Sequence, residues 1–112
     1  MITSSSNAKI KLVRSLQGKS RHRKAENAFV AEGVRLVEEA VDEAWPMDFL
    51  LYDETLSERG LALVQQLKEH SNLDISQIPP DLMAEISDTE TPQGVLAVLK
   101  RQRLPLAQSP DF

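Results

Sequence analysis

The sequence contains no cysteine among its 112 residues and only two histidines, His22 and His70. The lack of cysteine excludes disulfide bonds, thiolate metal sites and cysteine nucleophiles. Two scattered histidines do not suffice for a zinc site, so we expect no metal-binding residue. A chain without cysteine is compatible with a reducing compartment, and we expect a cytoplasmic protein.

Glycine is scarce, and no long apolar run is present. The four glycines are too dispersed for a phosphate-cradling or dinucleotide-binding loop, which needs them clustered at a turn from a strand into a helix. No apolar run approaches the roughly 20 residues needed to cross a bilayer, so we expect no membrane role. Adjacent carboxylates such as Glu38 and Glu39 fit the solvated face of a helix. The residues therefore predict no catalytic group and no cofactor site in this chain.

Aromatic side chains make up only 4% of the sequence. This low content argues against a platform on which nucleic-acid bases stack, because such platforms need several aromatic rings. If the protein binds a nucleic acid, the composition predicts recognition through phosphates, shape and 2′-hydroxyls.

Acidic residues are absent from the first 24 positions, although the whole chain has a net charge of -4. The other 88 residues hold seventeen acidic and six basic side chains, so the molecule is strongly polarised. Convergent cations of this kind bind phosphate backbones, whereas a basic N-terminus can also serve solubility or resemble a mitochondrial presequence. The seven basic residues are Lys9, Lys11, Arg14, Lys19, Arg21, Arg23 and Lys24.

Hydrophobic periodicity predicts helices that alternate with strands. Ser6 or Asn7 is placed to cap a first helix running to about Gln17, with Lys11 and Arg14 on its polar side. Its apolar face would be Ile10, Val13 and Leu16. A second helix is expected over residues 34–44, with Val34, Val37, Val41 and Ala44 buried. The other expected elements are strands near residues 29–30, within 45–53 after a break at Pro46, and at 73–76, a helix through 57–70, and a helix starting at Pro79 and Pro80 and anchored by Leu82, Met83 and Ile86.

Residues 95–99 are five consecutive apolar residues that follow a turn. Such a run is typical of a strand covered by helices on both faces. We therefore predict an α/β fold, a three-layer sandwich with a central sheet of about four strands between helices. From Lys100 onward the periodicity is lost and prolines appear, as in a linker. The expected organisation is a domain over residues 1–103, with residues 104–112 starting a linker.

Two stretches of the sequence resemble the N-terminal substrate-binding domain of the SpoU/TrmH (SPOUT) family of RNA ribose 2′-O-methyltransferases. They are NAKIKLVRSLQGKSRHRKAENAFVAEGVRLVEEA and ISDTETPQGVLAVLK. The resemblance covers about residues 3–100 and places the basic segment inside a folded domain, which removes the presequence alternative. The residues that carry it are Asn7, Lys11, Arg21, Phe29, Glu32, Gly33, Ser87, Thr89, Pro92, Gln93 and Gly94.

The resemblance implies a fold similar to ribosomal proteins of the L30e/L7Ae type. It also implies that the domain binds ribosomal or transfer RNA (rRNA or tRNA) for a catalytic domain that follows in the same chain. In the family that catalytic domain is knotted, binds S-adenosylmethionine and usually forms the homodimer. Its catalytic motifs have no counterpart in these residues, so we expect a piece of a larger methyltransferase that is inactive alone.

Two functions remain as alternatives at this point. In the first, the chain is an RNA-binding module in which Asn7 is a polar contact and the backbone is held by Lys11, Arg14, Lys19, Arg21, Arg23 and Lys24. In the second, it is a free-standing module of the same fold that binds a protein or a small ligand.

Overall fold

Four strands form one mixed sheet in the order β1-β4-β2-β3. Strand β4 is antiparallel to β1 and to β2, whereas β3 is parallel to β2. The strands are β1 (Ala28–Glu32), β2 (Met47–Tyr52), β3 (Asp74–Gln77) and β4 (Val95–Lys100). The computed structural model describes residues 1–18 and 28–100. The predicted RNA-binding residues Lys19, Arg21, Arg23 and Lys24, and the domain boundary after residue 103, lie outside them.

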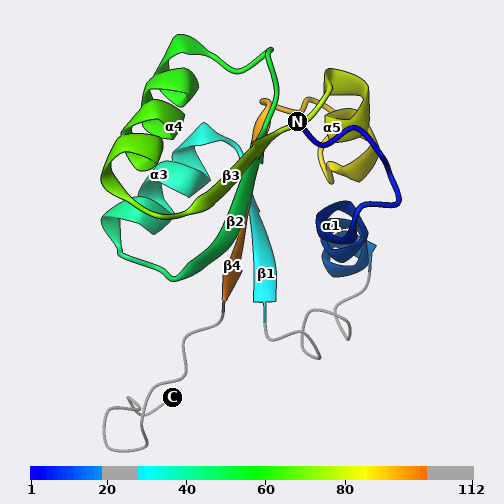
Figure 1. Ribbon diagram of the computed structural model, residues 1–112, viewed down its shortest axis with the longest axis horizontal. Helices are drawn as coiled ribbons and strands as arrows, with labels where there is room; N and C mark the ends of the chain where they lie inside the picture. Colours follow the sequence, from blue (N-terminus) through cyan, green and yellow to red (C-terminus); the bar gives the residue numbers. More distant parts are fainter. Residues whose placement is uncertain (19–27, 101–112) are drawn as a thin grey trace, which may run out of the picture.

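Helices cover both faces of this sheet. Figure 1 shows α3 and α4 on one face and α1 and α5 on the other, which makes three layers. The predicted α/β sandwich with about four strands is therefore confirmed. The helices are α1 (Ala8–Gly18), α3 (Val34–Asp42), α4 (Glu58–His70) and α5 (Pro80–Ile86).

Strand β4 supplies both halves of the hydrophobic core. Leu96 and Val98 pack in the cluster beneath α1 and α5, while Val95, Ala97 and Leu99 pack in the cluster beneath α3 and α4. All five side chains are at most 2% exposed, which confirms the prediction of a strand buried on both faces. Each large aliphatic side chain buried in this way contributes about 1.5 to 3 kcal/mol.

Helix α1 has the predicted cap and the predicted buried face. The Asn7 side-chain oxygen accepts a hydrogen bond from the backbone N–H of Lys9 at 2.8 Å. Ile10, Val13 and Leu16 are completely buried against the sheet and α5. The expected apolar residues of α5, which are Leu82, Met83 and Ile86, are also buried.

Glycine is required where β4 begins. Gly94 has a φ of 81°, a left-handed conformation that costs other residues energy. A Cβ atom there would lie 2.6 Å from Oδ1 of the buried Asp53. This oxygen accepts hydrogen bonds from the backbone N–H and the hydroxyl of Thr55. The close approach lets the backbone carbonyl of Gly94 accept a bond from Asp53 N at 2.9 Å.

Helix α3 ends earlier than its apolar pattern predicts. It stops at Asp42, and Ala44 is exposed with a φ of 56°, so the prediction that Ala44 is buried is wrong. The reason is a Schellman turn, in which Ala44 N donates to Val41 O and Trp45 N donates to Ala40 O. The turn leaves Ala40 buried in place of Ala44 and directs the chain into β2.

We expect Ala44→Gly to stabilise the protein. A residue with a Cβ atom in the left-handed conformation costs the folded state about 1 to 2 kcal/mol, which glycine would relieve. Glycine also has more freedom in the unfolded chain, and this offsets about 0.4 to 1 kcal/mol of the stabilisation. The free energy of unfolding, measured in urea, should therefore rise by roughly 0.5 to 1 kcal/mol. Ala62→Gly, in the middle of α4, is the control and should lower it by about 1 kcal/mol. Equal destabilisation by both changes would contradict the Schellman explanation.

Candidate nucleic-acid interface

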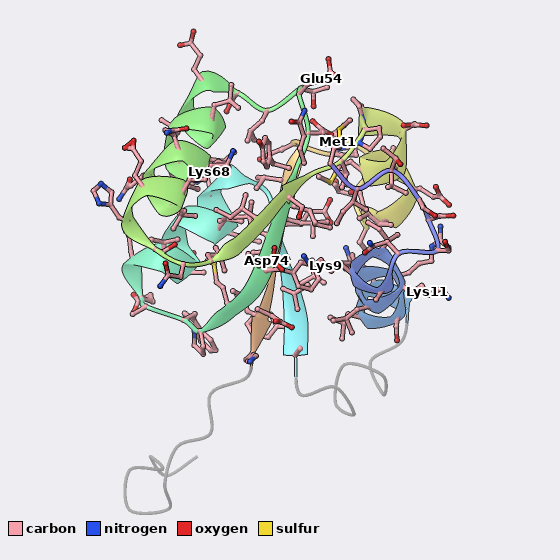
Figure 2. The ribbon with its side chains drawn as sticks, viewed as in Figure 1. Met1, Lys9, Lys11, Glu54, Lys68 and Asp74 are labelled. Carbon is pink, nitrogen blue, oxygen red and sulfur yellow. The ribbon has the colours of Figure 1, made fainter. Side chains whose placement is uncertain are left out.

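The basic side chains of α1 point in different directions. Lys9 forms an ion pair with Asp74 of β3, and its Nζ lies 5.7 Å from the centroid of the Phe49 ring. Figure 2 shows Lys9 on the side of α1 that faces Asp74 and Lys11 on the far side of the helix. Lys11 is exposed, and its side chain makes no hydrogen bond or ion pair with the described residues. Of these two lysines, Lys11 is therefore the one available to an external anion.

Arg14 is held by a neighbouring helix. Its guanidinium forms an ion pair with the carboxylate of Glu85 on α5, and the two side chains are 46% and 50% exposed. A half-exposed pair of this kind contributes about 0 to 1 kcal/mol. Arg14 can therefore exchange Glu85 for a phosphate at small cost.

The structure describes the first part of the predicted basic segment. It places Lys11 and Arg14 on α1 and Asn7 just before it; α1 ends at Gly18, and β1 resumes the described chain at Ala28. Ala28 pairs with Lys100 across the sheet, so the exposed Lys100 lies at the end of the sheet where the basic segment joins β1. Asn7 acts as the helix cap, and its side-chain oxygen is used within the fold.

The other motif residues are joined around Glu32 at the opposite end of β1. The Glu32 carboxylate accepts hydrogen bonds from Gln17 Nε2 at 3.0 Å, from Asp88 N at 3.0 Å, and from the Ser87 hydroxyl. These bonds connect the end of α1, the end of β1 and the loop that follows α5. The two resembling stretches thus form one hydrogen-bonded unit, and its residues have a structural role.

Gln93 completes this unit by capping α3. Gly33 stands at the N-cap position with a φ of 100° and has no side chain to accept a bond. The Gln93 side-chain oxygen accepts the N–H of Val34 instead, at 3.1 Å. A small pocket of about 180 Å³ lies between these residues and Thr89 and Thr91.

A second group of residues, which the sequence patterns did not indicate, surrounds Trp45. The rings of Trp45 and Phe29 form an edge-to-face pair with centroids 5.6 Å apart. The backbone carbonyl of the next residue, Pro46, accepts a hydrogen bond from Lys100 N at 2.9 Å. A lone tryptophan between the end of a helix and a proline was the available signal, but periodicity alone does not show that it meets Phe29.

Charged groups elsewhere form surface contacts. The Arg59 guanidinium donates to both Glu38 carboxylate oxygens, at 2.8 and 2.7 Å, and this hydrogen bonding raises the pKa of Arg59. The pair joins α4 to α3 and keeps Arg59 charged. In the described part of the chain, no three histidine, aspartate or glutamate side chains gather as metal ligands, and no helix is long and apolar enough to cross a membrane.

We expect Glu32→Ala to destabilise the fold by about 2 to 4 kcal/mol, because it leaves several donors without an acceptor. The measurement is the free energy of unfolding in urea. Glu39→Ala, on the exposed side of α3, is the matched control and should change it by less than about 0.5 kcal/mol. A Glu32→Ala protein as stable as the control would refute the role assigned to this carboxylate.

Comparison with known proteins gives one family and several solved structures. The family of the MRM3-like substrate binding domain matches residues 7–97. The chain is similar to an rRNA methyltransferase from Sinorhizobium meliloti, with a TM-score of 0.74 and 24% identity over 96% of this chain and 39% of that chain. It is also similar to the SpoU methyltransferase AviRb from Streptomyces viridochromogenes in complex with AdoMet, with a TM-score of 0.72 and 27% identity over 95% of this chain and 38% of that chain.

A third similar structure is an RNA 2′-O ribose methyltransferase, with a TM-score of 0.75 and 24% identity over 94% of this chain and 39% of that chain. The chain thus spans less than two fifths of the length of these structures. The two likenesses at 24% identity show a shared fold. No curated protein matches the sequence significantly.

The family match runs from the cap of α1 to the middle of β4, and it includes the whole first stretch of the resemblance and the second stretch up to Ala97. Together with the AviRb likeness, it confirms the resemblance to the N-terminal domain of SpoU/TrmH enzymes. The chain therefore belongs to the family of MRM3-like substrate-binding domains, which are the N-terminal substrate-binding domains of SpoU/TrmH RNA methyltransferases.

Proposed function

We propose that this domain binds rRNA or tRNA and presents a nucleotide to a methyltransferase domain of the same polypeptide. That domain would transfer a methyl group from S-adenosylmethionine to a ribose 2′-hydroxyl. The observation that carries the proposal is the basic segment over residues 9–24, which starts on the rigid helix α1 and leads into β1. The family match supports this proposal and does not favour a free-standing module.

The charge distribution supports binding to phosphates in particular. The first 24 residues carry seven basic and no acidic side chains, so this part of the protein attracts a polyanion although the net charge is negative. RNA carries one negative charge per nucleotide, and lysine and arginine contacts to it release counterions. The acidic excess on the remainder of the chain would keep RNA from binding elsewhere on the domain.

Each basic residue has a role in this proposal. Lys11 contacts a phosphate directly, and Arg14 does so after exchanging Glu85. Asn7 keeps its oxygen in the helix cap and offers its amide N–H groups. The main phosphate contacts are Lys19, Arg21, Arg23 and Lys24.

The remaining functions belong to residues beyond this domain. We propose that the domain extends to residue 103 and that residues 104–112 begin the linker to the catalytic domain. S-adenosylmethionine binding, catalysis and homodimer formation would reside in that following domain. No residue of this chain is assigned to any of them, and the chain alone should have no methyltransferase activity. The whole enzyme would act in the cytoplasm.

The test is binding of the purified chain to fluorescently labelled structured RNA over a series of salt concentrations. We expect the logarithm of the affinity to fall steeply with the logarithm of the salt concentration, because phosphate contacts release counterions. A triple Arg21→Ala, Arg23→Ala, Lys24→Ala variant should bind more weakly, with a slope that is smaller by about two to three units.

A charge-matched control separates this effect from a general loss of positive charge. The triple variant Arg35→Ala, Arg59→Ala, Lys68→Ala removes three cations from α3 and α4. It should leave the slope within about half a unit of the original value. Equal effects of the two triple variants, or no RNA binding by the original chain at low salt, would overturn the proposal.

A further inference from the structure

A pocket of about 390 Å³ opens beside Trp45 on the side of the sheet that α3 and α4 cover. Its apolar walls come from four different elements or their ends, and they are Val41, Trp45, Met47, Leu67 and Leu73. The polar residues Ser71 and Asn72 complete the lining. We call this hollow the Trp45 pocket. An apolar hollow of 300 to 1,000 Å³ with a few polar groups is typical of a site for a small organic group.

The fold holds Trp45 rigidly at this pocket. The Schellman turn at the end of α3 fixes its backbone, since Trp45 N donates to Ala40 O at 3.0 Å. The edge-to-face contact with Phe29, at an interplanar angle of 90°, holds its ring. The indole is nevertheless only partly buried, so the pocket presents an aromatic surface whose orientation is set before any ligand arrives.

The polar lining distinguishes this pocket from a simple packing defect. The Ser71 hydroxyl donates to Leu67 O at 2.7 Å and caps α4, so it is already used. The exposed side-chain amide of Asn72 makes no hydrogen bond with the described residues. An amide offers both donors and an acceptor, and in proteins it pairs with the edges of nucleic-acid bases.

One described cation, Lys100, lies near the Trp45 pocket. None of the described residues that line the Trp45 pocket is charged, whereas a smaller pocket that shares Trp45 is lined by Glu39 and Glu43. Lys100 lies close by, because its N–H is bonded to the carbonyl of Pro46, the residue after Trp45. Lys100 also pairs with Ala28 across the sheet.

We propose that the Trp45 pocket binds one unpaired nucleobase of the RNA, stacked on the indole and hydrogen-bonded to Asn72. This inference rests on the proposed function and adds to it a base-binding site that the low aromatic content argued against. Unpaired bases are the usual target of specific RNA recognition, and stacking on an aromatic ring contributes about 1 to 3 kcal/mol per base. A protein partner would need an extended apolar face rather than a hollow of this size.

Trp45 is the sole tryptophan of the chain, so its fluorescence reports directly on the pocket. The first experiment titrates the whole chain with a short single-stranded RNA and, separately, with the same RNA annealed to its complement. We expect the single strand to quench Trp45 fluorescence in a saturable manner. The duplex should bind through its phosphates with little quenching, because its bases stay paired.

Substitutions then test the two proposed contacts, with affinities measured by the anisotropy of labelled RNA. Trp45→Leu keeps an apolar side chain and removes the stacking surface, and it should raise the Kd for single strands about 5-fold to 150-fold. The salt slope should not change, because no cation is lost. Asn72→Ala should change the preference among the four bases. Leu61→Ala, an exposed apolar residue of α4 outside the pocket, is the matched control and should change neither.

Circular dichroism of each variant establishes that it is folded, and Asn72→Ala keeps Trp45 as a reporter if Trp45→Leu does not fold. Single strands that bind without quenching Trp45, or that quench it no more than the duplex does, would overturn the base site and leave the RNA-binding function standing. Absence of RNA binding at low salt would overturn both. A Trp45 emission that shifts with protein concentration in the absence of RNA would show a second copy covering the pocket and would also overturn the proposal.

Discussion

The burial of β4 on both faces is the constraint on which the rest of the structure depends. Its side chains alternate between two clusters, so one strand joins the layer of α1 and α5 to the layer of α3 and α4. Each layer can bury its apolar face only if β4 lies between β1 and β2. The loop before β4 is therefore tightly specified, since Gly94 lets the backbone approach Asp53 and Gln93 caps α3.

The two ends of the sheet have different tasks. At the end where β4 begins, the Glu32 carboxylate gathers donors from α1 and from the loop after α5, and it ties distant segments into one unit. At the other end, Ala28 and Lys100 pair, and Trp45 lies beside the point where β4 finishes. Structural hydrogen bonds thus occupy one end, and the other carries the aromatic pocket that we propose to bind a base.

The uneven charge would let a chain with net negative charge bind the polyanion that we propose as its ligand. Two of the three basic side chains on α1 already pair with carboxylates, Lys9 with Asp74 and Arg14 with Glu85. Exposed pairs are weak, so they place the cations without holding them strongly. Phosphate binding would come from local cation density, and specificity would come from a rigid aromatic pocket, because phosphate contacts carry no sequence information.

The sequence by itself determined the elements and their buried faces, because period and apolar character are local properties. The burial of Ile10, Val13 and Leu16 and the strand over residues 95–99 are as predicted, and Asn7 is one of the two predicted caps. The concentration of positive charge before residue 25 is likewise a property of the sequence alone. Both resembling stretches could be recognised, but not the reason that they occur together.

The tertiary structure alone decided which distant residues meet. Glu32 bonds to Gln17 and Ser87, and Trp45 meets Phe29, because strand order and register bring them together. The end of α3 was also decided by tertiary structure, since its apolar period continues to Ala44 while the chain must turn at Asp42 to enter β2. Pairing across a sheet depends on every strand at once, and no local pattern contains that information.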